Sequence, residues 1–207
     1  MSSNLQDGFG CSVCGERHVL PLSYSVKAPL AAGAIPVDEL EQRVVITLDQ
    51  CVIDNRDFYL RGRILVPVIG LEEPFVWGIW VEVSPKNFVR TNELWTVEGR
   101  ENEAVFPGWL NSQLPVFGDT FNLEVSVQTQ PVGQRPQFTV VDEEHPLAVE
   151  QRNGITMERV EEIADDASSG EACPAGRAHC AWGGHFVTCI PFPGGWMSVG
   201  LPLVGVV

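Results

Sequence analysis

Two long apolar runs joined by a short turn constrain the fold of this chain more than any other feature. In the second run every other side chain is apolar: Phe75, Trp77, Ile79, Val81 and Val83. The two-residue period of a β-strand places all of them on one face. Residues 58–69 form the first run, and residues 70–74 supply the turn. The sequence therefore predicts a β-hairpin on which the core is built.

Other segments predict partners for this hairpin. Strict alternation over residues 121–127 indicates a half-buried strand, and residues 43–48 and 137–141 are also typical of strands. Ser84-Pro85, His145-Pro146 and Thr156 each resemble the start of a helix. Residues 108–110 and 114–118 are interrupted by turn formers and are expected to be irregular. We expect an α+β fold, with an antiparallel sheet of about five or six strands and two or three helices on one face.

The charge balance limits the classes of partner. The chain carries 27 acidic and 13 basic residues, a net charge of -14. Residues 1–166 hold all of it, because the remainder contains only Glu171 and Arg177. Such an acidic surface repels phosphate backbones and anionic lipids, so nucleic acid and membrane are not expected as partners. A protein or small molecule fits better.

The ends of the chain suggest a compartment and a domain boundary. The first ten residues lack the features of a signal peptide, and no apolar run is long enough to span a membrane, so a cytoplasmic location is expected. Residues 1–166 are expected to form one domain. Residues 167–207 are rich in glycine, proline and cysteine and predict a poorly packed tail. The tail's cysteines and histidines give a second metal site as the rival interpretation: Cys173, His179, Cys180, His185 and Cys189.

A CxxCG segment near the start indicates a structural zinc site. Two cysteines separated by two residues, Cys11 and Cys14, can direct both sulfurs at one ion, and the following glycine permits the turn. His18 and Cys51 are the nearest further ligands, with His145 or a water as substitutes for His18. A redox dithiol and two ordinary thiols are the competing interpretations, and Cys51 alone fits a small buried hydrophobe.

A polar group in the second half of the chain offers a different function. An acid–base pair of His145 and Glu150, with arginines to hold an anionic substrate, would make an enzyme or a ligand-binding domain. The same side chains could instead cap a helix or tie a turn to a helix end. The candidate ligand-binding residues are Gln130, Arg135, His145, Glu150, Gln151 and Arg152. Two hypotheses remain open: a non-enzymatic, zinc-stapled interaction module, and this enzyme or small-ligand domain.

Several long segments together resemble a known family. These are CSVCGERH, DQCVID, FYLRGRILVPVIG, FVWGIWVEVS, QPVGQRP and HPLAVEQRNGITMERVEEIA. They resemble a bacterial family of uncharacterised proteins, the domain of unknown function with the number twenty-one ninety-nine. The resemblance covers residues 9–166 and implies an intact domain of that family. It implies no activity.

Overall fold

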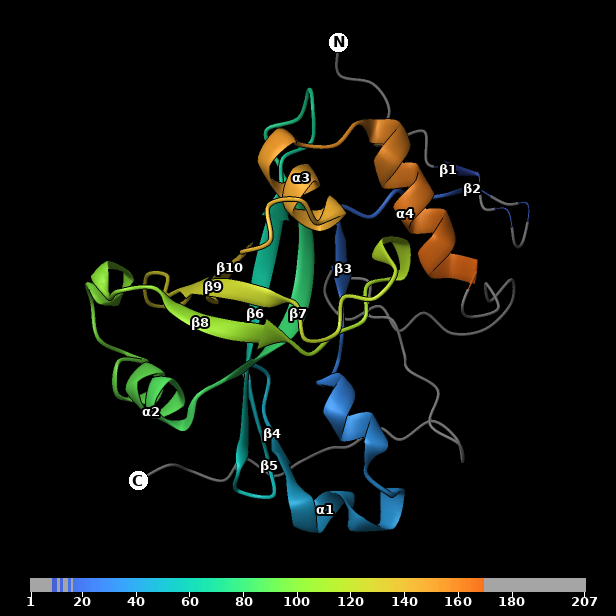
Figure 1. Ribbon diagram of the computed structural model, residues 1–207. Helices are drawn as coiled ribbons and strands as arrows, with labels where there is room; N and C mark the ends of the chain where they lie inside the picture. Colours follow the sequence, from blue (N-terminus) through green and yellow to red (C-terminus); the bar gives the residue numbers. More distant parts are fainter. Residues whose placement is uncertain (1–8, 11, 13–14, 16, 170–207) are drawn as a thin grey trace.

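Five strands of the computed structural model close into a small barrel. The structure describes residues 9–10, 12, 15 and 17–169. Neighbouring strands pair in the order β7, β8, β9, β10 and β6, and β6 pairs back to β7 (Figure 1). Their bounds are β6 Asp57–Val66, β7 Phe75–Val83, β8 Phe106–Leu110, β9 Glu124–Gln128 and β10 Gln137–Val140. The mixed α+β class is confirmed, but the prediction of a simple antiparallel sheet with helices on one face is wrong.

Three further strands extend the barrel into an eight-stranded sheet. β3 (Ser23–Ser25) pairs in parallel with β7, and β5 (Gln50–Ile53) pairs antiparallel with the first half of β6. β4 (Val44–Ile46) forms the outer edge beyond β5. β10 also pairs in parallel with β6. The expectation of five or six antiparallel strands is therefore corrected to a larger, mixed sheet.

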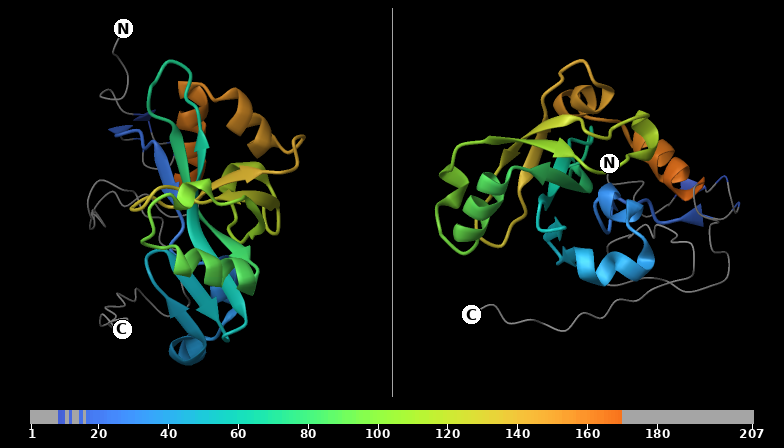
Figure 2. Two further views of the ribbon diagram at one scale, coloured as in Figure 1. Left: turned by 90° about the vertical axis from the view of Figure 1, so that its left-hand side faces the viewer. Right: turned by 60° about the horizontal axis from the view of Figure 1, so that its bottom comes forward.

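The helices lie around the sheet rather than on one face, which corrects that part of the expectation. α3 and α4 lie near the upper end of the barrel, whereas α2 and α1 lie toward the lower end (Figures 1 and 2). The ring of Phe88 packs on that of Phe58 at 5.0 Å, which fixes α2 on β6. The bounds are α1 Leu40–Arg43, α2 Pro85–Glu93, α3 Pro146–Asn153 and α4 Met157–Ser169. Short 3-10 turns, Leu30–Ala34 and Val37–Glu39, precede α1.

The predicted hairpin is confirmed as the centre of the core. β6 and β7 pair along their whole length, from Phe58 opposite Val83 to Val66 opposite Phe75. The apolar face of β7 is buried inside the barrel. Trp80 points to the opposite face, yet it is also fully buried, and its indole N–H donates to the carbonyl of Val26 at 3.1 Å. The central strand is therefore covered on both faces.

β8 is a strand that the sequence analysis missed. The sequence analysis assigned this segment to an irregular region because Pro107 and Gly108 are typical turn formers. A side chain at Gly108 would collide with Val81 and would lie 3.0 Å from the carbonyl oxygen of Glu82. Glycine is thus needed here for close packing of β8 on β7, not for a turn.

A two-stranded hairpin stands apart from the main sheet. β1 (Phe9–Gly10) and β2 (Arg17–His18) pair antiparallel, beside α4 in Figure 1. At the other end of the described chain, α4 ends at Ser169, and the expected tail lies almost wholly outside the described residues. No helix among residues 17–169 is long and apolar enough to cross a membrane.

Candidate functional site

His145 and Glu150, the candidate acid–base pair, each have another partner, as the alternative of helix capping proposed. The ring Nδ1 of His145 accepts a hydrogen bond from the backbone N–H of Leu147 at 3.1 Å and so caps α3. Glu150 instead accepts from Arg159 Nε at 2.8 Å, which ties α3 to α4. His145 and Glu150 therefore have different partners, and each holds a helix in place.

Two other members of the predicted set also join elements of the fold. Gln151 donates to the carbonyl of Phe138 at 2.7 Å and accepts from the N–H of Val140 at 3.1 Å, so it fastens α3 to β10. Arg152 lies 3.9 Å from Glu143 on the surface. These contacts support the fold. Gln151 and Arg152 also line one groove, but the other four members of the predicted set do not.

Gln130 belongs to a loop that is held by a buried arginine. Arg100 is only 3% exposed. Its guanidinium donates to the carbonyls of Gln130, Trp95, Pro131 and Gln134 at distances of 2.7 to 3.1 Å, and it stacks over the ring of Trp95. Three of these carbonyls belong to residues 130–134, so one cation holds this loop and joins it to Trp95. This loop leads directly into Arg135.

The residues of the expected zinc site are only partly described. Cys11 and Cys14 lie outside the described residues. His18 lies on β2 beside α4, whereas Cys51 lies on β5 at the opposite end of the long strands (Figure 1). Burial raises the pKa of the Cys51 thiol from 9.0 to about 12, which disfavours the thiolate that zinc needs. The structure does not bring His18 and Cys51 together, and Cys51 is a small buried hydrophobe.

No group of three or more His, Cys, Asp or Glu side chains suitable for a metal ion occurs within the described ranges. The zinc hypothesis for Cys11, Cys14 and His18 stays a prediction. The paired strands β1 and β2 flank the CxxCG segment, and Gly15 has a φ of 74°, the left-handed conformation that glycine favours.

Arg135, from the predicted set, belongs to a cluster of three arginines that the sequence analysis did not assemble. Arg61 and Arg63 are on the outer face of β6, two residues apart, so their side chains leave the strand on the same side. The Arg61 and Arg135 guanidiniums both lie 3.4 Å from the carbonyl oxygen of Leu48. We refer to Arg61, Arg63 and Arg135 as the arginine cluster.

The cluster forms where β6 changes its neighbour. The backbone N–H of Arg61 donates to the carbonyl of Asp49, just before β5, at 2.8 Å. The N–H of Arg63 donates to the carbonyl of Pro136, just before β10, at 2.9 Å. Between them Gly62 faces the barrel interior, where Phe138 fills the adjacent space. The strand order thus brings residues 47–49 and 134–136 together over two arginines.

One carboxylate accompanies the three guanidiniums. Arg135 Nε donates to Asp49 Oδ1 at 2.6 Å, in an ion pair that is about one-third exposed. Arg63 has only a 3.4 Å contact to the side-chain oxygen of Gln134. Arg61 lies over the ring of Trp80, 5.8 Å from its centroid. With one negative and three positive groups, the cluster carries a formal charge of +2.

The electrostatics of the cluster are unfavourable without a further anion. Burial, and then the neighbouring charge of Arg135, lower the pKa of Arg61 below its usual value, although Asp49 opposes this. The Nε atoms of Arg61 and Arg63 are buried and have no hydrogen-bond partner among the described residues. Ion pairs are made by five surface arginines outside the cluster: Arg43, Arg56, Arg90, Arg152 and Arg159. Arg61 and Arg63 make none with any described residue.

A sequence signal for this site was present. Arg61-Gly62-Arg63 places two like charges on one face of a strand that is otherwise strongly apolar. Like charges on one face of a strand repel each other, so such a pair has to be explained by a partner. Arg135 could not be added from the sequence, because its approach depends on closure of the barrel.

Comparison with known proteins identifies the family. A family model described as "Uncharacterized protein conserved in bacteria (DUF2199)" matches residues 10–155. The chain belongs to the DUF2199 family. The resemblance noted in the sequence is thereby confirmed. Searches of curated proteins and of solved structures found no match to this DUF2199 chain.

Proposed function

We propose that this DUF2199 protein is a small-ligand-binding domain that holds an anionic group at the arginine cluster. The observation that carries the proposal is that Arg61 and Arg63 form no ion pair with any described residue, in a chain with 27 acidic side chains. Five other arginines form ion pairs with carboxylates. The chain has a surplus of negative charge, yet Asp49 is the one carboxylate among the described residues that pairs with this cluster.

The chemistry of arginine favours such a ligand. A guanidinium presents several N–H donors in a planar fork that matches the oxygens of a carboxylate or a phosphate. The partly buried cluster reduces screening by water, so an ion bound there interacts more strongly than it would at an open surface. A bound anion would also relieve the repulsion between Arg61 and Arg135.

The rest of the cluster supports binding without a chemical step. Arg135 is held in place by Asp49, and Arg61 is held by Trp80 and the carbonyl of Leu48. No nucleophile or acid–base pair is part of the proposal. The site is therefore a preorganised receptor for an anion, and the ligand's oxygens complete its hydrogen bonding.

Titration with inorganic phosphate tests this function. Calorimetry and thermal unfolding are followed for the wild type and for the double variant Arg61→Gln/Arg63→Gln, at constant ionic strength maintained with chloride. The matched control is Arg56→Gln, which also removes a positive charge but lies outside the cluster and is 77% exposed.

Phosphate should bind and raise the melting temperature of the wild type and of Arg56→Gln, because a ligand that binds only the folded state stabilises it. The double variant should lose both responses. Equal responses in all three proteins would mean that phosphate acts only by exclusion from the protein surface, and the proposal would be wrong.

A further inference from the structure

A groove begins next to the arginine cluster and runs along the outer face of β6 and β10 toward α3. Its volume is about 650 Å³, and much of its lining is apolar. The residues that define it include Leu65, Pro67, Leu71, Gln137, Thr139 and Ala148. We call this feature the β6–β10 groove.

The groove lies beside the arginine cluster, although none of the three arginines is part of its lining. Leu65 follows Arg63 by two residues and leaves β6 on the same face. Gln137, also in the lining, is the register partner of Arg63 across the β6–β10 pairing. From Arg63 to Pro67 the strand advances by roughly 13 Å. A ligand bound at the arginines would thus have the groove beside it, with the apolar side chains of Leu65, Pro67 and Ala148 in its lining.

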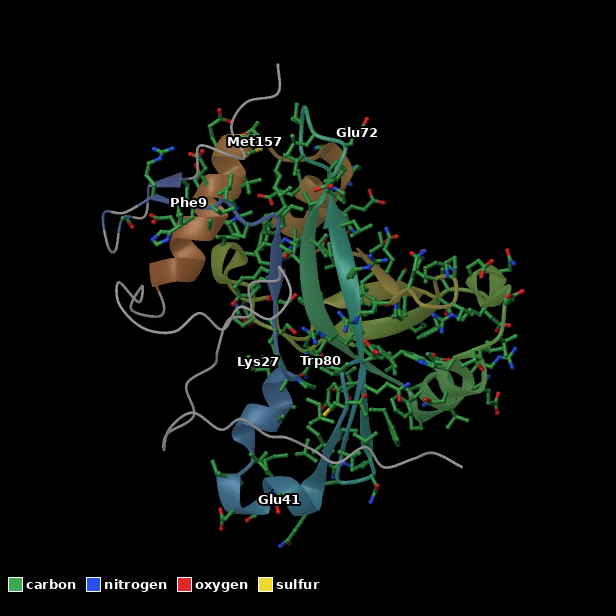
Figure 3. The ribbon with its side chains drawn as sticks, turned by 180° about the vertical axis from the view of Figure 1, so that it is seen from behind. Phe9, Lys27, Glu41, Glu72, Trp80 and Met157 are labelled. Atoms are coloured by element: carbon green, nitrogen blue, oxygen red, sulfur yellow. The ribbon has the colours of Figure 1, made fainter. Side chains whose placement is uncertain are left out.

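The charges at the two ends of the groove determine which end of it an anionic group would occupy. At the far end of the groove, Arg152 is already close to Glu143 at 3.9 Å, and Glu72 adds another negative charge. Glu72 lies at the upper end of the β6–β7 pair, whereas Trp80, which Arg61 covers, lies near its middle (Figure 3). The uncompensated positive charge is therefore at the arginine end alone.

We propose that the ligand is a phosphate monoester with an apolar body, bound with its phosphate at the arginine cluster and its body in the β6–β10 groove. This rests on the proposed function. A phosphate monoester carries close to two negative charges at neutral pH and matches the +2 of the cluster, whereas a carboxylate would leave one positive charge unbalanced. The apolar part of the lining, which includes Leu65, Pro67 and Leu71, is the reason for an apolar body, although Gln151 and Arg152 also line the groove.

The test compares ligands that differ in one part at a time. Methyl phosphate and octyl phosphate share the head, and octanoate shares the tail of octyl phosphate with a carboxylate in place of the phosphate. Each is titrated into the full chain by calorimetry, below its micelle concentration. Octyl phosphate should bind at least about tenfold more tightly than methyl phosphate, because each buried methylene contributes to binding. It should also bind more tightly than octanoate.

Two variants locate the parts of the ligand. Thr139→Trp places a large ring in the groove at an exposed position and should abolish the advantage of octyl over methyl phosphate. Val45→Trp, at an exposed position on the edge strand β4, is the control and should retain that advantage. Arg61→Gln/Arg63→Gln should weaken both phosphates.

The outcomes separate this inference from the function on which it rests. Two results would contradict binding of an apolar body in the groove and leave the anion site in place. In the first, methyl phosphate binds through the arginines but octyl phosphate binds no more tightly. In the second, Thr139→Trp still prefers octyl phosphate. If octanoate binds as tightly as octyl phosphate, the proposal that the cluster prefers a phosphate to a carboxylate is wrong. If neither inorganic phosphate nor methyl phosphate binds the wild type, both proposals are wrong.

Discussion

The ring of Phe138 occupies the space that a side chain at Gly62 would need. A Cβ atom at Gly62 would also lie 2.6 Å from the carbonyl oxygen of Pro136. Phe138 is fully buried and cannot move aside into solvent. This contact lets β10 approach β6 closely enough to close the barrel, and it places Arg61 and Arg63 on the opposite, outer face.

We expect Gly62→Ala to lower the free energy of unfolding by about 1–3 kcal/mol, because overpacking a filled core forces neighbouring groups to shift. The measurement is urea unfolding followed by tryptophan fluorescence. Gly33→Ala is the control, since nothing lies within 4 Å of a Cβ at Gly33, and its change should stay within about 0.5 kcal/mol. Equal stability of Gly62→Ala and the wild type would contradict the packing argument.

Arg100→Lys should destabilise the fold although it keeps the charge. A lysine ammonium cannot reach four carbonyls with the geometry of a guanidinium, and each buried carbonyl left unpaired costs about 1–3 kcal/mol. Arg90→Lys, on the exposed surface of α2, is the matched control with little expected effect. Phosphate affinity should fall as well, because residues 130–134 position Arg135. A variant with normal stability would show that these bonds contribute nothing.

Asp49→Asn removes the one carboxylate that, among the described residues, pairs with the arginine cluster. At low salt we expect a loss of up to about 1 kcal/mol, typical of a partly exposed ion pair. Phosphate should stabilise this variant more than it stabilises the wild type, since an anion can replace the missing carboxylate. Glu39→Gln, which breaks the ion pair with Arg43, is the control and should show no added response to phosphate. The idea fails if both variants respond alike.

Stability should fall at alkaline pH, partly through Cys51. Burial raises the pKa of this thiol from 9.0 to about 12, so above pH 9 the unfolded chain loses the proton first. The stability due to the protonated thiol is complete below pH 9 and declines as the pH rises toward 12, by up to about 1.4 kcal/mol per pH unit. Burial raises the pKa of Tyr59 as well, which acts in the same direction.

Urea unfolding between pH 7 and 11 measures this effect. Cys51→Ala should be less stable at pH 7, because it leaves a cavity, but its stability should decline less steeply above pH 9. Parallel curves for the variant and the wild type would exclude Cys51 as a source of the pH dependence.

Metal analysis of the purified full chain tests the zinc hypothesis. We expect about one zinc per chain, lost in Cys14→Ser because a thiolate ligand is removed. Cys51→Ala should retain the zinc, since Cys51 lies at the other end of the long strands from His18. Absence of zinc from protein prepared without chelators would end the hypothesis, and loss of zinc from a folded Cys51→Ala would return Cys51 to the ligand set.

Local patterns in the sequence predicted local structure well. The alternation over residues 75–83 gave the right face of β7, and Ser84-Pro85 marked the start of α2, where Ser84 accepts from the N–H of Asn87. β8 was not predicted, because it contains the turn formers Pro107 and Gly108. The requirement for glycine at position 108 comes from its packing on β7, which the local sequence does not show. The closure of β10 onto β6 left no periodic signal, since it joins distant segments in parallel.

The candidate site was predicted only in part for the same reason. Arg135 was singled out, but its partner Asp49 is 86 residues away in the sequence. His145, Glu150 and Gln151 were chosen for their chemistry, and they cap or join elements instead. Polar side chains near helix ends often form hydrogen bonds with nearby backbone groups. The sequence alone does not distinguish this role from a role in ligand binding.

The parallel pairing of β10 with β6 also affects the order in which parts of the fold are expected to form. The β6–β7 hairpin can form early because its strands are adjacent, whereas β10 must return across a long stretch of chain, and such distant contacts form slowly. Arg135 reaches Arg61 and Arg63 only after that return. The arginine cluster is therefore expected to form after the β6–β7 hairpin, and a bound anion would stabilise the closed barrel over states in which β10 has not yet returned.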